Sequence, residues 1–266
     1  MAFEGLESVT DMSVADWIAP RLRGFGGRVT QVVPDGFAAY ARILHPADDE
    51  FGEPTTWSEV CRRTGRTAHP LMQWSSVAAG GRWTPETAAG PPRVGEAPPA
   101  VLGAILDVLG GFSDGEPDCF HAMWEGWGWL HPGGWALLVA TDDPSRSAPP
   151  HEELQPNALS ADVLAGPRLD LPARSYLLFR GPLHAALRMG HQVTSDWFVP
   201  QPPSLLWPAD RSWCLATEID FDSTLVGGPR ELVDALTREP SLEAWPVQAT
   251  DDLTVHGDRI NPGAGA

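Results

Sequence analysis

Proline divides this chain into short pieces, and this limits the length of any helix or strand. Three segments are rich in proline: 84–100, 142–157 and 200–213. Because proline lacks a backbone donor and fixes φ, it interrupts helices and central strands. We therefore expect long loops at 84–100 and 142–157, and no regular structure over 200–213. The first two segments are also the only candidate boundaries in a chain that we expect to form one domain, residues 1–266.

The segments between these loops carry short helix and strand patterns. The expected helices begin after Ser13, behind a capping box at Thr56–Glu59, and near residues 99, 182 and 229. The expected strands are 28–33 paired with 37–45, 118–130 in a hairpin with 134–141, 168–172, 175–181 and 213–222. No strict β-α-β order appears. The pattern therefore predicts an α+β fold, with a mainly antiparallel sheet packed with several short helices.

The segment WCLATEIDFD, residues 213–222, alternates between apolar and other residues. On one strand, Glu218, Asp220 and Asp222 would point to the same face, roughly 6–7 Å apart. Two interpretations stay open: the acids form a solvated sheet face, or they line a groove that takes a cation. Arg211, beside the segment, is a candidate to neutralise one of them.

The segment WEGWGWL brings three tryptophans together around an acid. Trp124, Trp127 and Trp129 lie within six residues of one another, and Glu125 lies among them. They would form either an aromatic wall for a cation or ring-bearing ligand, or simply a core. Trp207, in the third proline-rich segment, would lie on a stiff loop. Such a loop suits partner recognition, or a lid over the core.

Charge narrows the class of partner. The net charge is -17, and residues 101–266 hold nine arginines against 23 acidic residues. Such a surface repels phosphate backbones and anionic lipids, so we expect neither nucleic acid nor membrane as a partner. A basic protein or a cationic small molecule fits better, although solubility alone would also explain the charge. No apolar run is long enough to span a membrane, and three scattered cysteines indicate a reducing cytoplasm.

Catalytic and cofactor motifs are missing from the sequence. There is no H-E-x-x-H, no G-x-S-x-G and no Walker-type loop, and the chain contains no lysine. We therefore expect no cofactor and no metal site. Cys119 and His121, two residues apart on an expected strand, are either a nucleophile pair or a buried structural pair.

The strings YARILHPA, WEGWGWL, YLLFRGPL and WPADRSWCLATEIDFDSTLVGG together resemble a group of cytoplasmic proteins of high-GC Gram-positive bacteria. That group has no assigned function. The resemblance spans most of the chain and implies a bacterial cytoplasmic setting and a full-length domain. It implies no activity and no catalytic residues.

Two functions follow from these observations. The first is a non-catalytic acidic binding protein that engages a basic protein or a cationic ligand; neutralisation of a toxin, as by an immunity protein, is one instance. The second is a hydrolase or isomerase that uses carboxylates beside a tryptophan-lined pocket. The oligomeric state does not follow from the sequence.

Overall fold

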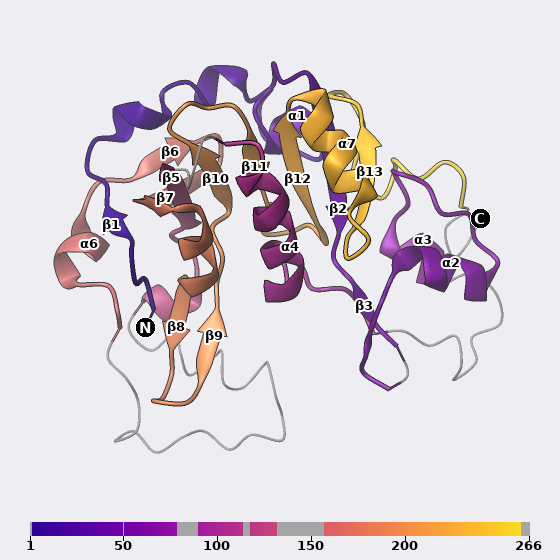
Figure 1. Cartoon of the computed structure of the whole chain (residues 1–266), viewed down its shortest axis with the longest axis horizontal. Coiled ribbons are helices and arrows are strands. Elements are labelled where there is room, and N and C mark those ends of the chain that lie inside the picture. Colours follow the sequence, from indigo (N-terminus) through magenta and orange to yellow (C-terminus); the bar gives the residue numbers. More distant parts are fainter. Residues whose placement is uncertain (1, 50, 79–89, 114–117, 132–156, 262–266) are drawn as a thin grey trace.

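The computed structural model describes residues 2–49, 51–78, 90–113, 118–131 and 157–261. Its central element is an antiparallel sheet of nine strands, which confirms the α+β fold (Figure 1). Eight strands follow the order β1-β7-β5-β10-β11-β12-β2-β13, and β6 pairs with β7. The strands are β1 (Glu7–Ser8), β2 (Ala39–Leu44), β5 (Asp118–Trp124), β6 (Leu169–Leu171), β7 (Arg174–Pro182), β10 (Leu205–Pro208), β11 (Cys214–Ala216), β12 (Ser223–Gly228) and β13 (Glu243–Val247).

Short elements surround this sheet. Two small two-stranded sheets pair β3 (Ala47–Asp48) with β4 (Pro54–Thr55) and β8 (Gly190–Gln192) with β9 (Phe198–Pro200). The α-helices are α1 (Val29–Val32), α2 (Trp57–Thr64), α3 (Trp74–Ala78), α4 (Pro99–Gly110), α6 (Ala161–Ala165) and α7 (Arg230–Arg238). The 3₁₀ helices are η1 (Met12–Ala15), η2 (Ala19–Arg21), η3 (Gly128–Leu130) and η5 (Leu183–Arg188).

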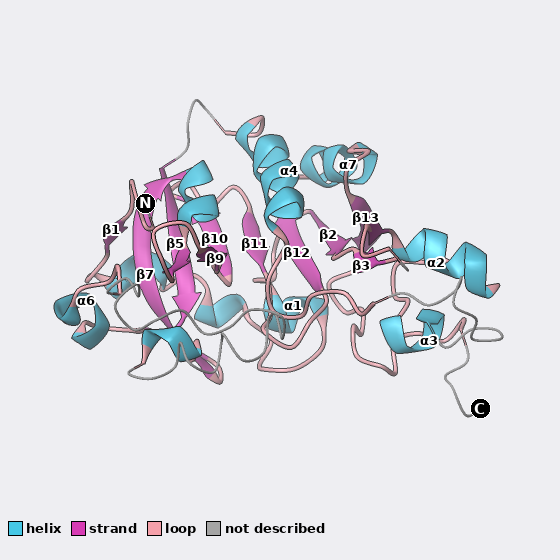
Figure 2. Cartoon of the chain, turned by 90° about the horizontal axis from the view of Figure 1, so that it is seen from below, coloured by secondary structure: helices cyan, strands magenta, loops and turns pink. Residues whose placement is uncertain are grey.

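Both faces of the sheet are covered. Helices α4 and α7 pack on one face, and α1 lies on the other (Figure 2). Alternation along β11 serves both layers: Trp213 and Leu215 join the core under α4 and α7, whereas Cys214 and Ala216 join the core under α1. The face that we expected to end in water is therefore buried.

Helix α2 confirms the expected capping box only in part. The hydroxyl of Thr56 accepts the backbone N–H of Glu59 at 3.1 Å, and Gly65 ends the helix with φ +72°. The Glu59 carboxylate, however, binds Arg62 and Arg63. Glu243 of β13 instead accepts the first two backbone N–H groups of the helix, those of Trp57 and Ser58. The start of the helix is therefore held partly by a residue from another strand, because two arginines one turn away bind the carboxylate of Glu59.

The expected strand 28–33 is wrong, because this segment forms helix α1. Its N–H groups at Val29 and Thr30 donate to the carbonyls of Asp251 and Ala249, at 3.1 and 3.2 Å. Tertiary hydrogen bonds therefore outweigh the β-propensity of a valine-rich run. The expected helix after Ser13 is reduced to η1 and η2, and Pro20 lies in the first turn of η2. A proline is tolerated there because first-turn N–H groups have no partner within the helix.

The expectation for 200–213 is also wrong, because β10 is a central strand. It pairs with β5 on one side and β11 on the other. Pro208 is its last residue, so the missing donor falls at the end of the ladder. Trp207 is therefore fully buried core rather than part of an exposed loop.

The expected hairpin at 118–130 differs from the structure. Strand β5 ends at Trp124, and both of its edges are already paired, with β7 and β10. Residues 134–141 lie outside the described residues, as do 142–156. Of the other proline-rich segment, residues 90–98 are described and contain only an isolated bridge at Gly90.

Candidate functional site

The acidic segment 213–222 is not one strand. Strand β11 stops at Ala216, and the N–H of Phe221 donates to the carbonyl of Glu218 at 3.0 Å. This turn connects β11 to β12, which the sequence did not reveal. The three carboxylates therefore lie on a hairpin loop rather than on one sheet face, and the predicted acidic groove along a strand is wrong.

Two of the three carboxylates share a single arginine. Arg174 approaches Glu218 at 2.6 Å and Asp220 at 3.1 Å. Its guanidinium also lies over the rings of Phe25 and Trp124, 4.8 and 5.6 Å from their centroids. We call these five residues the arginine cluster. The chain thus supplies its own cation at the place where we expected a ligand.

Three loops build the arginine cluster at one end of the sheet. Arg174 begins β7 directly after Ala173, whose φ of +64° marks the tight turn from β6. Phe25 lies between Gly24 and Gly26, which both have positive φ. These backbone conformations, which side chains other than glycine rarely adopt, bring the Phe25 ring over Arg174.

Exposure differs strongly within the arginine cluster. The side chains of Arg174 and Glu218 are 16% and 12% exposed, whereas Asp220 is 72% exposed. Partly desolvated pairs hold their geometry better than surface pairs, which contribute little. Of the three predicted acids, only Asp220 is therefore open to a partner.

Asp222, whose side chain is 22% exposed, lies at the edge of the core instead. Its carboxylate lies 3.4 Å from the guanidinium of Arg42, whose side chain is 1% exposed. Arg42 also donates to Ser223 and to the carbonyls of Pro70 and Met72. Burial raises the pKa of Asp222, and Arg42 opposes that shift. Burial likewise lowers the pKa of Arg42. This pair ties β2 to β12 and to the loop before α3.

The tryptophans do not form one wall. Trp127 meets Trp124 edge-on at 5.4 Å, but Trp129 stacks on His191 in a separate core. The backbone turns after Trp124, so the shared parity expected of a longer strand is lost. Trp124 remains partly exposed beside Arg174, within the candidate site, whereas Trp127 is linked to the site only through its contact with Trp124.

Glu125 and Arg211 each bind a partner other than the predicted acids. Glu125 receives a hydrogen bond from Arg168 at 2.8 Å. Arg211 places its guanidinium 5.9 Å from the ring centroid of Trp17, and its φ of +59° marks a turn. Arginine therefore neutralises Glu125, and Arg211 does not serve the carboxylates of the hairpin loop.

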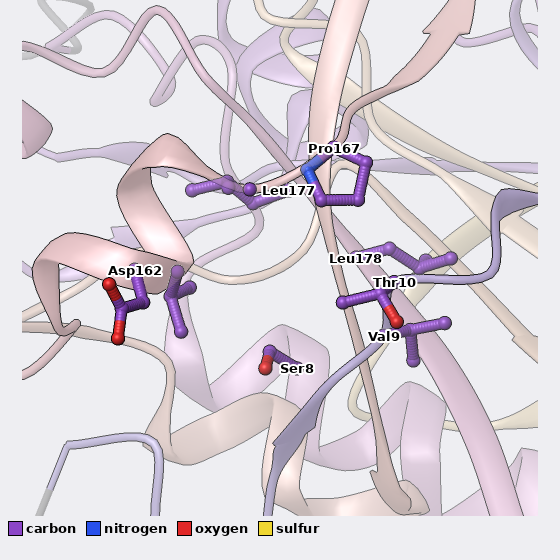
Figure 3. A pocket seen from close by; sticks show the side chains of 9 residues that line it. Ser8, Val9, Thr10, Asp162, Pro167, Leu177 and Leu178 are labelled. Carbon is purple, nitrogen blue, oxygen red and sulfur yellow. The ribbon is translucent and has the colours of Figure 1, made fainter.

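A separate hollow lies at the outer edge of the sheet. It measures about 140 Å³. Helix α6 with the residues after it forms one wall, and the segment that follows β1 forms the opposite wall (Figure 3). We call it the edge pocket, lined by Ser8, Val9, Thr10, Asp162, Val163, Gly166, Pro167, Leu177 and Leu178.

Sequence reasoning missed the edge pocket, although part of its signal was present. Ser160 caps α6 by accepting the N–H of Val163 at 3.4 Å, and Gly166 follows the helix end. A serine cap with Asp162 in the first turn and Gly-Pro at the end predicts such a helix. The place of that helix beside β7 depends on strand order, which no local pattern contains.

The Cys119–His121 pair is buried on β5, and both side chains are fully covered. Burial raises the pKa of the Cys119 thiol to about 12 and lowers the pKa of His121 to about 4. A neutral thiol beside a neutral imidazole is a poor nucleophile, because only the thiolate attacks. The pair therefore fits the structural alternative.

Neither a metal site nor a membrane span is found among the described residues. In the described residues, no group of three histidine, cysteine or carboxylate side chains could hold a metal ion. No helix in the same part of the chain has the length and apolar character that a membrane span requires. The chain matches no protein-family model, no curated protein and no solved structure.

Proposed function

We propose that this chain is a cytoplasmic, non-catalytic binding protein that engages a basic protein or a cationic ligand through its acidic surface. Neutralisation of a basic toxin is one instance. Three free cysteines, all buried, are consistent with a reducing compartment.

One observation carries the proposal: arginines neutralise the acids of the hairpin loop, and several exposed acids elsewhere are left without an arginine. Arg42 and Arg174 bind the least exposed acids of the hairpin loop. Several exposed acids have no arginine partner among the described residues, namely Asp162, Asp210, Glu231 and Asp234. The surplus negative charge therefore lies on the surface, where it attracts a basic partner and speeds association.

The hydrolase or isomerase alternative finds less support in the geometry. A general acid needs a raised pKa and access to a substrate. Glu125 and Glu218 are each bound by an arginine, so neither carboxylate is free to meet a substrate. Asp222 has the raised pKa, but it faces Arg42 inside the core. No specific observation places one of these carboxylates in a reactive pocket.

Titration with octa-arginine and with octa-glutamate tests the proposal. We expect the protein to bind octa-arginine at 50 mM salt and to bind it roughly tenfold more weakly at 300 mM salt, because screening shortens the reach of surface charge. We expect no binding of octa-glutamate. Isothermal titration calorimetry measures both.

The opposite ligand preference, or affinity for octa-arginine that does not change with salt, would overturn the proposal. Asp220→Asn serves as an internal check, since it removes the one open carboxylate of the arginine cluster. We expect it to weaken octa-arginine binding by about two- to fivefold, the range of one exposed ion pair.

A further inference from the structure

The edge pocket exists because two short strands cover β7 incompletely. β6 pairs with the first residues of β7, up to Tyr176, and β1 pairs with Phe179 and Arg180. Beyond β1, the N–H of Val9 still donates to the carbonyl of Leu178 at 2.8 Å. The hollow lies between these two covers. Its apolar side chains come from Val9, Val163, Leu177 and Leu178, with Pro167 beside them.

Among the described residues, no strand pairs with the outer edge of β1, the strand beside the pocket. Val9 pairs with Leu178 through a hydrogen bond toward β7, and Glu7 occupies the equivalent position opposite Arg180. Hydrogen-bonded and open positions alternate in an antiparallel ladder. The N–H and C=O of Ser8 therefore point away from β7, to the side where another extended chain could add. Ser8 is itself exposed.

The size of the hollow sets what it can hold. A cavity near 150 Å³ accommodates a benzene-sized group, so about 140 Å³ suits one aliphatic or small aromatic side chain. It is too small for a typical cofactor or drug-sized ligand, whose sites begin near 300 Å³. The shape fits a single anchor residue from a larger partner.

Charge indicates which neighbours that anchor should have. Asp162 lines the pocket from the first turn of α6, and it is exposed (Figure 3). Unlike Glu218, it has no ion pair with an arginine in the described part of the chain. Asp11 follows the lining segment on the opposite wall and is exposed as well. A cationic residue next to the anchor would meet an unpaired carboxylate.

We propose that the edge pocket binds an extended basic segment of the partner protein. One aliphatic side chain enters the hollow, an arginine or lysine two residues away on the same face of the segment pairs with Asp162, and the segment adds beside β1 through the backbone of Ser8. Strand addition supplies affinity and the side-chain pocket supplies specificity. This inference rests on the proposed function, because it names where and how the basic partner binds.

The probe is the peptide acetyl-TRTLTRT-amide, which places an arginine two residues to either side of the leucine anchor, on the same face of an extended chain. The comparison peptides are acetyl-TRTGTRT-amide, without the anchor, and acetyl-TETLTET-amide, with reversed charge. We expect the first to bind at least about tenfold more tightly than the second, since a buried leucine side chain contributes roughly 1.5–3 kcal/mol. Fluorescence anisotropy gives the affinities, and amide chemical shifts locate the binding at residues 8–10.

Three variants test the three parts of the inference. Val163→Phe fills the hollow and should reduce the affinity for acetyl-TRTLTRT-amide at least about tenfold, to that of the glycine peptide. Asp162→Asn should reduce it about two- to fivefold. Ser8→Pro removes the outward N–H without touching the ladder to β7, and should also weaken binding. Glu59→Gln is the matched control, because Glu59 is a first-turn acid that Arg62 and Arg63 already neutralise, and it should leave the affinity for the anchored peptide unchanged.

The outcomes separate this inference from the proposed function. If the basic peptides bind and the three variants bind them as well as the unchanged protein does, the edge pocket is not the site, although the proposed function stands. If no basic probe binds, octa-arginine included, both fail. Circular dichroism of each variant verifies the fold, and Asp162→Asn keeps the test decisive if Val163→Phe does not fold.

Discussion

The arginine cluster and the edge pocket both place carboxylates beside apolar groups, but only the first contains its own counter-ion. In the cluster, Arg174 holds Glu218 and Asp220 and lies over two rings. At the pocket, Asp162 has no arginine partner in the described residues and borders a hollow of about 140 Å³. The difference indicates that the fold supplies its own counter-charge to the acids that stand out as a run in the sequence. An isolated acid beside a hollow, without such a counter-charge, is available to a partner.

Replacement of Arg42 would show the largest contribution that an internal arginine makes in this fold. Arg42→Met leaves Asp222 in the core without its cation, and leaves Ser223 and two carbonyls without a donor. Removing one member of a buried pair typically costs about 3–5 kcal/mol of unfolding free energy. Urea denaturation measures the loss.

The control for this change is Arg21→Met, since Arg21 is exposed and lies over Trp17 at 5.4 Å from the ring centroid. We expect a loss within about 1 kcal/mol there. Equal effects of the two substitutions would mean that the buried pair does not hold the sheet as described.

Two buried histidines should make the stability of the folded chain depend on pH in the acid range. Burial lowers the pKa of His45 and of His121 to about 4, so both are neutral in the folded chain. In the unfolded chain they accept protons near pH 6.5. The free energy of unfolding should therefore be constant above pH 6.5 and fall as the pH drops toward 4, by up to about 1.4 kcal/mol per pH unit for each histidine.

Urea unfolding at pH 7.5, 6.0 and 5.0 measures this slope. Carboxylates with lowered pKa values, such as Glu59 at about 2, lose their contribution only below about pH 4.5, so they do not confuse this window. Stability that stays constant down to pH 5.0 would contradict the assignment of both histidines.

The sequence predicted elements whose signals are local. Helix α2 follows its cap at Thr56, α4 begins at Pro99, and α7 follows Pro229, all as expected. Strand β2 was predicted from its apolar run, and the α+β class from the mixture of elements. In each case the residues that decide the structure lie within the element or next to it.

The rest depended on partners distant in the chain. Residues 29–32 form a helix because carbonyls near residue 250 accept its N–H groups. Strand β10 persists among prolines because β5 and β11 pair with it on both sides. The sequence singled out the acids of 218–222 but left open whether they face water or a cation. Their partners, Arg42 and Arg174, come from other strands, and no spacing in the sequence reveals them.

Removal of Arg174 tests the comparison between the arginine cluster and the edge pocket. The effects expected here are the smallest of those predicted. Arg174→Ala should lower the unfolding free energy by about 1–3 kcal/mol, because it deletes charge-assisted hydrogen bonds and ring contacts that are partly buried. Asp162→Asn should change it by less than about 0.5 kcal/mol, as expected for an exposed side chain without a partner.

Binding should change in the opposite sense. Without Arg174, Glu218 and Asp220 lose their internal cation, and the surface beside Phe25 and Trp124 is left with two free carboxylates. We expect Arg174→Ala to bind octa-arginine about two- to fivefold more tightly than the unchanged protein, whereas Asp162→Asn binds it more weakly. Should Arg174→Ala leave this affinity unchanged or reduce it, the arginine would not be what keeps these acids from a partner. The contrast between a self-neutralised cluster and an open pocket would then have to be abandoned.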